Sequence, residues 1–310
     1  MKLANYWDDD GKLRLGVVEN DRLLDAERLT AEANTAQSVR STDELIALDD
    51  AAFAALADRI GEALRDETLV RASALDPEHT RLAPCVAKPG KIVCVGLNYK
   101  KHAEETNSAI PAFPILFNKF ANALTAHGAA VRVPEVTSKM DYEAELAIVI
   151  GKTAFNVSED DALDFVFGYC AANDLSARDL QLRTSQWMLG KSLDGFCPLG
   201  PWLVTADEVG DPNKLEIQSY VNGERRQSSN TCDMIFDCKT IVSYVSRHMT
   251  LQPGDVILTG TPEGVVMGYP EERQVYLKAG DKVEIRIEKL GALSNVLIGA
   301  GESDRFAITE

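Results

Sequence analysis

The feature that most constrains the fold is an alternating segment in the middle of the chain, Asp141 to Gly151. Its even positions are all apolar, whereas its odd positions begin with acidic residues and become apolar further on. An alternation of period two predicts a β-strand with one face turned to a core. On such a strand Glu143 and Glu145 lie on the same face, with Cα atoms roughly 6–7 Å apart. Two carboxylates this close in so apolar a segment require a positive charge between them, from a divalent cation or from a Lys or Arg side chain.

A third carboxylate follows a second apolar run. The run over residues 167–172 leads to Asp174 and is followed by a turn or short helix over residues 176–186. Asp174 is therefore expected at the end of a strand, where its side chain can project into a pocket. With Glu143 and Glu145 it forms an all-oxygen ligand set, which suits Mg²⁺, Mn²⁺ or Ca²⁺ better than zinc or copper. The alternative is a solvated strand face with an unrelated aspartate, because acidic pairs are common and perturbed acids mark functional sites only statistically.

The charge of the chain argues against some classes of function. Its 310 residues carry a formal net charge of −16, so non-specific binding to nucleic acid or to anionic membranes is disfavoured. A small anionic substrate needs only local positive charge and is not excluded. We expect no signal peptide, because the N-terminus runs straight into Asp8–Asp10, and no apolar stretch approaches the ~18–20 residues of a membrane span. The six cysteines lack CxxC spacing and several lie in apolar runs, which predicts a cytoplasmic protein without disulfides.

Turn-forming residues divide the chain into two parts. Residues 13–26 predict a β-hairpin, and residues 43–66 predict a helix that begins after a capping box at Ser41. Prolines over residues 75–90 then interrupt the pattern. We therefore predict a small α+β N-terminal domain over residues 1–85 and a second, larger domain over residues 86–310. The second domain is rich in strand-like segments, so the fold class is α+β and mostly β; these segments include 91–96, 114–119, 215–221 and 280–287.

Polar residues in this second part carry further hypotheses. His102 and Glu105 are three residues apart and share a face if their segment is helical. A carboxylate beside an imidazole fixes its tautomer and prepares a general base, but on spacing alone a surface ion pair is the better interpretation. Lys119 is either a structural cation or a pocket residue. Lys191 is either a salt-bridge partner or a charge that neutralises carboxylates and binds substrate.

Five motifs, in order, resemble the fumarylacetoacetate hydrolase family and span most of residues 90–300. They are Gly96-Leu97-Asn98-Tyr99 with His102 and Glu105, Asp141-Tyr142-Glu143-Ala144-Glu145-Leu146, Asn173-Asp174-Leu175-Ser176-Ala177-Arg178-Asp179-Leu180-Gln181, Gly190-Lys191-Ser192-Leu193-Asp194 and Gly254-Asp255-Val256-Ile257-Leu258-Thr259-Gly260-Thr261-Pro262. The resemblance is closest to small, bacterial-type members with an N-terminal extension. It implies a mixed β-sandwich roll and a homodimer.

The resemblance also implies roles for single residues. The implied ligands of Mg²⁺ or Mn²⁺ are Glu143, Glu145 and Asp174. His102, oriented by Glu105, is expected on a lid over the substrate, where it activates water. Lys191 is expected to reach the reacting oxygen. Gln181 is expected to position substrate or water, and the turn at Gly260 and Thr261 to hold a substrate carboxylate.

The implied activity is metal-dependent hydrolysis of a carbon–carbon bond in a 2,4-dioxo acid of the acylpyruvate or fumarylpyruvate type. The metal is expected to act as Lewis acid and electron sink while Lys191 adds positive charge at the same oxygen. Oxaloacetate decarboxylation and keto–enol tautomerisation fit the same site and need no attacking water, and sugar-derived 2,4-diketo acids are further possible substrates. A non-catalytic metal-binding protein of the same fold is the remaining alternative. The presence of His102, Glu105 and Lys191 argues against it.

Overall fold

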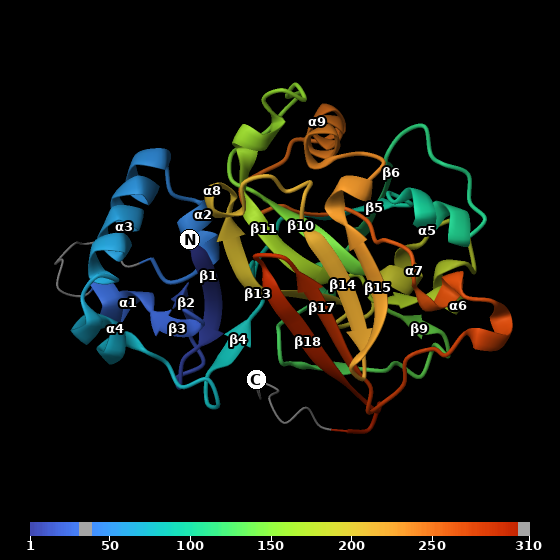
Figure 1. The fold of residues 1–310 in the computed structure, drawn as a ribbon, viewed down its shortest axis with the longest axis horizontal. Coiled ribbons are helices and arrows are strands. Elements are labelled where there is room, and N and C mark those ends of the chain that lie inside the picture. Colours follow the sequence, from blue (N-terminus) through green and yellow to red (C-terminus); the bar gives the residue numbers. More distant parts are fainter. Residues whose placement is uncertain (31–38, 303–310) are drawn as a thin grey trace.

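A computed structural model describes residues 1–30 and 39–302 and shows two sheets that form the body of the molecule (Figure 1). Among these residues the larger sheet has eleven strands. Its main path runs through β3 (Arg22–Asp25), β2 (Leu13–Glu19), β1 (Lys2–Trp7), β13 (Cys197–Thr205), β11 (Val166–Asn173), β10 (Ala144–Ile150), β16 (Val256–Leu258), β5 (Ile92–Gly96) and β6 (Ile115–Lys119). Off this path, β4 (Arg81–Ala83) pairs with β1, and β7 (Leu124–Thr125) pairs with β13.

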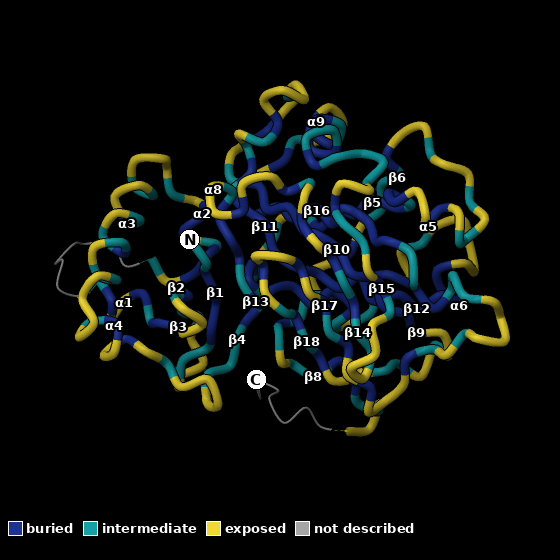
Figure 2. The backbone as a smooth tube through the Cα atoms, viewed as in Figure 1, coloured by how far each residue is buried: buried dark blue, intermediate teal, exposed yellow. Residues whose placement is uncertain are grey.

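The smaller sheet packs on the larger one and closes the main core. Its five strands follow the order β15 (Glu224–Asn230), β14 (Glu216–Val221), β17 (Lys282–Ile287), β18 (Gly291–Ile298) and β8 (Ala130–Arg132). Leu146 and Tyr169 of the larger sheet share one buried cluster with Ile217 and Ile285 of the smaller sheet. Figure 2 shows β10, β11 and β16 buried over most of their length. This two-sheet arrangement confirms the prediction of a mostly β, α+β fold.

Helices lie around the two sheets and, among the described residues, none is long and apolar enough to span a membrane. The helices are α1 (Ala26–Thr30), α2 (Thr42–Ile46), α3 (Asp50–Ala63), α4 (Glu67–Ser73), α5 (Lys100–Glu105), α6 (Arg178–Gln181), α7 (Met188–Lys191), α8 (Ala206–Val209) and α9 (Cys238–His248). Short 3₁₀ turns are Ala121–Ala123, Ala162–Phe165, Thr231–Asp233, Val266–Gly268 and Glu271–Arg273.

The N-terminal part agrees with the sequence in its hairpin and differs in its helix. β2 pairs with β3 as predicted, and the Ser41 side chain accepts the N–H of Glu44 as a capping residue does. The single helix predicted over residues 43–66 is wrong, because α2 and α3 are separate helices. Asp49 adopts an extended conformation and accepts the N–H of Ala52, so it caps a new helix at the point where the continuous pattern predicted none.

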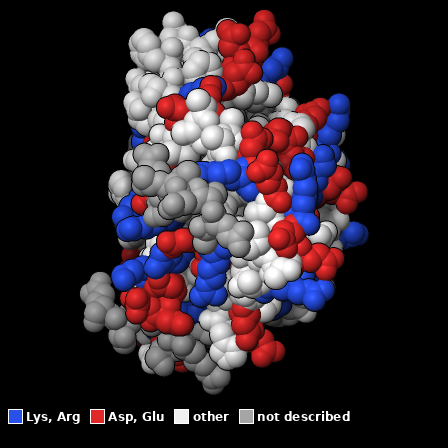
Figure 3. Space-filling view, turned by 90° about the vertical axis from the view of Figure 1, so that its left-hand side faces the viewer, with Lys and Arg blue, Asp and Glu red and all other residues white. Residues whose placement is uncertain are grey.

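The N-terminal part shares its sheet and one core with the rest of the chain. Leu3 of β1 lies opposite Leu203 of β13, and both belong to a second buried cluster that also holds Ile60 and Cys170. The division at residue 85 stays a prediction. On the outer face of this part, basic side chains are interspersed with acidic ones rather than gathered into a basic surface (Figure 3).

The alternating segment that opened the sequence argument forms two strands instead of one. β9 (Met140–Asp141) pairs with β12 (Ser176–Ala177), whereas β10 begins only at Ala144 and pairs with β11. Tyr142 and Glu143 lie between the two strands. The N–H of Glu143 donates to the Asn173 side chain, which provides its hydrogen bond outside the ladder. The segment therefore turns between two sheets, and this turn places Glu143 beside the end of β11.

Candidate active site

Three buried carboxylates converge where β10 begins and β11 ends. Glu143, Glu145 and Asp174 each place an oxygen within 4.8 Å of the other two. Glu143 precedes β10, Glu145 lies in β10, and Asp174 follows the last residue of β11, as expected. The N–H of Asp174 donates to the carbonyl of Glu143 at 3.0 Å, so the two ligand-bearing segments are bonded directly to each other. The structure therefore brings together all three residues that the sequence predicted as metal ligands.

Two buried lysines contact this triad. Lys191 Nζ lies 2.6 Å from Glu143 Oε2 and 2.7 Å from Asp174 Oδ2. Lys119 Nζ lies 2.5 Å from Asp174 Oδ1 and also donates to the carbonyl of Lys191. Burial opposes the charge of Lys191, but Asp174 and Glu143 outweigh it and raise the pKa of the lysine. Both lysines therefore belong to the site, and Lys191 occupies part of the space between two of the carboxylates.

The third carboxylate has no such partner among the described residues. Glu145 makes no ion pair with a described Lys or Arg, and its Oε2 accepts only the N–H of Gly260, at 2.6 Å. Burial, together with the negative charges of Asp174 and Glu143, raises the pKa of Glu145 well above its usual range. Glu143 behaves in the opposite way. Burial disfavours its ionised form, but the charges of Lys191 and Arg178 hold its pKa well below its usual range.

Arg178 connects the triad to a further acid. Its Nη1 lies 2.7 Å from Glu143 Oε1, and its Nε lies 2.8 Å from Asp141 Oδ2. Nη1 also donates to Gln181 Oε1 at 2.9 Å, so the side-chain NH₂ of Gln181 remains a donor at the cavity. The remaining nitrogen, Nη2, is buried and has no hydrogen-bond partner in the described structure. A buried donor without a partner beside a cavity is suited to an acceptor on a ligand.

The histidine and glutamate predicted as a dyad form one. Both lie on α5, and His102 Nδ1 is 2.8 Å from Glu105 Oε1. The His102 side chain is only 6% exposed, which excludes the surface ion pair considered from spacing alone. The other glutamate oxygen, Oε2, accepts the N–H of Gly264 at 2.9 Å. The dyad is therefore bonded to the segment that follows β16.

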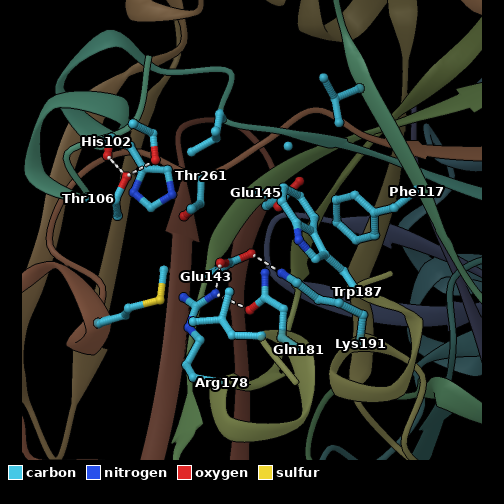
Figure 4. Close-up of a pocket in the computed structure, with 16 residues that line it drawn as sticks. His102, Thr106, Phe117, Glu143, Glu145, Arg178, Gln181, Trp187, Lys191 and Thr261 are labelled. Atoms are coloured by element: carbon cyan, nitrogen blue, oxygen red, sulfur yellow. Dashed lines mark hydrogen bonds and ion pairs between the residues drawn. The ribbon is translucent and has the colours of Figure 1, made fainter. Parts of the chain in front are cut away.

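The turn after β16 lies between the dyad and the triad. Figure 4 shows Thr261 between the His102 ring and the Glu143 carboxylate. The N–H of Gly260, which was predicted to bind substrate, donates instead to Glu145 and so supports a predicted metal ligand. Further along, the N–H groups of Val266 and Met267 donate to Asp141. The segment that follows β16 thus donates backbone N–H groups to Glu145, Glu105 and Asp141.

These groups enclose one cavity of about 200 Å³. In Figure 4, His102 and Thr106 lie on one side of it, and Phe117, Trp187 and Lys191 lie on the other. Glu143, Glu145, Gln181 and Thr261 also line the cavity. In Figure 1 the helices that border it, α5, α6 and α7, lie at the end of the molecule opposite α1, α3 and α4.

Sequence reasoning missed three members of the site and left one undecided. Asp141 was named only as the start of a strand and Arg178 only as part of a motif. Gln227, whose side-chain NH₂ donates to Thr261 Oγ1, was not named as a site residue at all. Lys119 was left between a structural and a pocket role. The sequence does contain a signal for Arg178. An arginine close to apolar runs is expected near the core, and a buried arginine needs acidic partners. No pattern in the sequence singled out Gln227, because the hairpin that contains it has the pattern of an ordinary hairpin.

The residues fit a divalent cation in ligand chemistry and in charge. Four carboxylates, those of Asp141, Glu143, Glu145 and Asp174, face three cations, those of Lys119, Arg178 and Lys191, which leaves one excess negative charge. Glu145 is the acid without an ion-pair partner. All three ligands offer hard oxygen atoms, as Mg²⁺ and Mn²⁺ require. Such an ion competes with Lys191 for Glu143 and Asp174.

Comparison with known proteins agrees with this geometry. The family model described as Fumarylacetoacetate (FAA) hydrolase C-terminal matches residues 91–298. A curated relative from Xenopus laevis, named as the mitochondrial oxaloacetate tautomerase fahd2, is 48% identical over 219 residues, which are 70% of this chain and 68% of that protein.

Two solved structures share nearly the whole fold. A fumarylacetoacetate hydrolase from Exiguobacterium antarcticum is 36% identical with a TM-score of 0.78, covering 96% of this chain and 99% of that one. A maleylpyruvate hydrolase from Sphingobium sp. SYK-6, solved with manganese(II) and pyruvate, is 32% identical with a TM-score of 0.74 and the same coverage, 96% and 99%. Both the matched residues and the shared fold lead to one conclusion: this chain belongs to the fumarylacetoacetate hydrolase family.

Proposed function

We propose that the protein is a divalent-metal-dependent hydrolase that cleaves a carbon–carbon bond in 2,4-dioxo acids of the acylpyruvate type. The observation that carries the proposal is a cavity lined by Glu143 and Glu145 of the buried acidic triad and by His102 of the His–Glu dyad. The triad supplies an electron sink when it holds Mg²⁺ or Mn²⁺. The dyad supplies a base for water. Together these are the two functions that hydrolysis of such a bond needs.

The reaction balances with the groups at hand. Water adds to the distal carbonyl, the bond between that carbon and C3 breaks, and the electron pair passes to the pyruvate part, which takes up a proton at C3. His102, oriented by Glu105, accepts the proton of the attacking water. Lys191 and the NH₂ of Gln181 place positive charge and a donor at the oxygen that becomes negative. The unpartnered Nη2 of Arg178 is a further donor for this anionic substrate.

The size and polarity of the cavity support a compact substrate. Its volume of about 200 Å³ is below the range of ~300–1,000 Å³ for pockets that hold drug-sized ligands. A short acylpyruvate or another small 2-oxo acid therefore suits it better than a long-chain acid. The manganese and pyruvate in the Sphingobium hydrolase support the same substrate class for this chain.

A second candidate function is keto–enol tautomerisation of oxaloacetate. Decarboxylation of the same acid is a closely related reaction. The name of the Xenopus relative favours it. Tautomerisation only moves a proton between C3 and the C2 oxygen, and decarboxylation only breaks the C3–C4 bond. Neither needs the water that His102 would activate, so the role of His102 separates these reactions from hydrolysis.

Turnover with matched histidine variants tests the proposal. Acetylpyruvate and oxaloacetate are supplied with Mn²⁺, with and without EDTA, to the wild type, to His102→Gln and to His79→Gln. His79 is a matched control, because it too pairs with a carboxylate three residues away, Asp76 at 2.7 Å, but is 81% exposed. We expect EDTA to abolish turnover. His102→Gln is expected to slow acetylpyruvate hydrolysis by ~10²–10⁴-fold without weakening Mn²⁺ binding, and His79→Gln to change nothing.

Each outcome decides between the functions. Hydrolysis at the wild-type rate in His102→Gln contradicts the assignment of the base. Turnover of oxaloacetate without cleavage of acetylpyruvate replaces the hydrolase by the second candidate. Lack of turnover of either acid, with Mn²⁺ bound, favours a non-catalytic metal-binding protein.

We also propose that the protein is a homodimer. β6 is an edge strand of the larger sheet in the described structure, and apolar Phe120, next to it, is 53% exposed. Met188 and Leu189 on the neighbouring α7 are exposed as well. Edge strands with apolar surroundings favour association. Light scattering is expected to give twice the chain mass for the wild type and the chain mass for Phe120→Asp. The control Phe155→Asp, at another exposed phenylalanine, is expected to remain a dimer. A monomeric wild type contradicts the proposal.

A cytoplasmic location is the last part of the proposal. Five of the six cysteines are buried, and all six are free. Reduced core cysteines are typical of the cytosol. Fractionation of the native cells tests it, and recovery with a membrane-bound or exported fraction contradicts it.

A further inference from the structure

Gln227 lies closer to the chemistry than its place in the fold suggests. It belongs to β15, the edge strand of the smaller sheet, yet it is only 1% exposed. Its side chain reaches the turn after β16 and the start of β10. A single amide therefore touches both the strand that carries the predicted metal ligands and the turn that carries Thr261.

The orientation of this amide is fixed by two backbone groups. Gln227 Oε1 accepts the N–H of Ala144 at 3.0 Å, and Nε2 donates to the carbonyl of Pro262 at 2.8 Å. A backbone N–H can only donate and a carbonyl can only accept, so the oxygen and nitrogen of the amide cannot be exchanged. The second hydrogen of Nε2 then points to Thr261 Oγ1, at 2.8 Å.

This bond decides what the Thr261 hydroxyl can do. Because Oγ1 accepts from Gln227, its own proton must point in another direction. Thr261 is 3% exposed and lines the cavity, and no described residue provides an acceptor for that proton. The free proton is therefore available to an acceptor in the cavity, between His102 and Glu143 (Figure 4).

We propose that Gln227 is a positioning residue that presents the Thr261 hydroxyl as a hydrogen-bond donor to the anionic oxygen of the substrate. The inference rests on the proposed function, since it takes the substrate to be a 2-oxo acid. It adds to that function a prediction of which chemical groups of a ligand the site favours. With Thr261 held as a donor, this wall of the cavity favours carboxylate or carbonyl oxygens over hydroxyl or amine groups.

The second contact of Gln227 extends its effect to the ligand strand. Ala144 lies between Glu143 and Glu145, and its N–H donates to Gln227. The same amide thus sets the separation between the substrate donor and the two glutamates. A change at Gln227 is expected to disturb substrate binding first, because Glu143 and Glu145 keep their own bonds to Asn173, Arg178 and Gly260.

The test measures pyruvate and Mn²⁺ binding separately and needs no turnover. Pyruvate is titrated by calorimetry into the Mn²⁺-loaded full chain, and Mn²⁺ alone is titrated by electron paramagnetic resonance. The variants are Gln227→Met, Gln227→Glu, Thr261→Val and the double variant Gln227→Met/Thr261→Val. Gln218→Met serves as control, because Gln218 lies on the adjacent β14 and, among the described residues, its side chain hydrogen-bonds only with Tyr220.

We expect Gln227→Met and Thr261→Val each to weaken pyruvate binding by roughly tenfold to a hundredfold, as loss of a bond to a charged group does. Mn²⁺ affinity is expected to change less than threefold in both. Gln227→Glu is expected to weaken pyruvate binding more than Gln227→Met, because a carboxylate accepts the Thr261 proton and turns the hydroxyl oxygen to the substrate. In the double variant, Gln227→Met should add nothing to the loss caused by Thr261→Val.

Different results overturn different claims. Pyruvate affinity unchanged in Gln227→Met, or losses that simply add in the double variant, overturn the positioning role while leaving the proposed function intact. A wild type that binds neither Mn²⁺ nor pyruvate overturns the proposed function instead. If the Gln227 variants do not fold, Thr261→Val and Thr261→Ser still decide: wild-type pyruvate affinity in Thr261→Val, or its loss in Thr261→Ser, contradicts the donor.

Discussion

At the scale of single residues, the site is organised by Lys191. Its ammonium group lies between Glu143 and Asp174 and neutralises part of the charge that a divalent cation would neutralise. Buried charges left without a partner cost several kcal/mol, so the lysine stabilises the metal-free protein. In the proposed function, a bound cation would free the same lysine to approach the reacting oxygen of the substrate. One side chain would then serve stability without metal and catalysis with metal.

This double role predicts how Lys191→Met behaves. Without metal, loss of the ammonium leaves Glu143 and Asp174 facing each other, and the free energy of unfolding is expected to fall by about 3–5 kcal/mol. Mn²⁺ is expected to bind at least tenfold more tightly and to restore the melting temperature, while hydrolysis is lost. Thermal melts and Mn²⁺ titration check this. Weaker Mn²⁺ binding in Lys191→Met would show that the lysine supports the ion rather than competing with it.

Glu145 predicts the pH dependence of the site. Its pKa is raised above the ordinary carboxyl range, mainly by burial and then by Asp174 and Glu143. An acid with a raised pKa in the folded protein holds its proton more tightly when folded than when unfolded. The free energy of unfolding is therefore highest below the ordinary carboxyl pKa and falls as the pH rises from there toward the folded-state pKa. The metal-free wild type is therefore expected to lose stability over that interval relative to Glu145→Gln. Mn²⁺ affinity should rise over the same interval, because the ligand must lose its proton. Parallel stability curves for the two proteins would contradict this.

Single residues also show how much of the site the sequence can predict. Glu143, Glu145, Asp174, Lys191 and the His102–Glu105 pair were named in advance and meet at one cavity. Short-range spacing and ordered motifs carry that information. Gln227 acts through contacts that depend on how the two sheets pack, and no local pattern of the sequence encodes such contacts. Arg178 differs, because its place beside buried segments was a usable signal for acidic partners.

At the scale of elements, the position of α5 depends on two glycines in the segment after β16. Gly264 donates its N–H to Glu105. A Cβ atom at Gly268 would lie 2.3 Å from Glu105 Cδ, so only glycine lets that carboxylate occupy its place. The segment therefore holds the glutamate of the dyad from outside the helix. The helix itself has only six residues and is too short to be stable alone.

Gly268→Ala is expected to displace Glu105 and to separate it from His102. Hydrolysis should fall by at least tenfold, whereas Mn²⁺ affinity should not change, because the triad does not contact Gly268. Gly61→Ala is the matched control: it lies in α3, nothing lies within 4 Å of the added atom, and we expect a gain of about 0.5–1 kcal/mol in the free energy of unfolding. A Gly268→Ala enzyme with full activity would contradict the dependence of the dyad on this segment.

The elements also show where sequence patterns fail. The alternation over residues 141–151 continues through Tyr142 and Glu143, yet these residues lie outside the strands. Their N–H groups donate to side chains instead, that of Tyr142 to Asp141 and that of Glu143 to Asn173. In the same way the helical pattern over residues 43–66 continues through the cap at Asp49. In both segments the periodic pattern of apolar side chains runs on without a break. The regular backbone hydrogen bonds, however, stop and are replaced by bonds to side chains.

At the scale of the whole molecule, the N-terminal part completes the larger sheet. β1 covers the edge of β13, and Leu3, Leu24 and Ile60 bury apolar residues of the catalytic part. The predicted division at residue 85 therefore crosses a continuous sheet and a shared core. The helices that carry residues of the cavity, α5, α6 and α7, lie at the other end of the molecule (Figure 1).

Deletion of residues 1–85 tests this dependence. The remaining chain is expected to expose the β13 edge and the apolar face beneath it, and so to aggregate or to melt well below the full chain. Light scattering and thermal melts measure both. A fragment of residues 86–310 that stays monodisperse and melts at the temperature of the full chain would show that the second part folds independently.

The most direct measurement is an anomalous-scattering map from a crystal of the full chain grown with Mn²⁺. The account predicts one strong peak about 2.0–2.3 Å from oxygens of Glu143, Glu145 and Asp174, with Lys191 displaced from its position between Glu143 and Asp174. No peak at these carboxylates at saturating Mn²⁺, with Lys191 still bridging them, would contradict it.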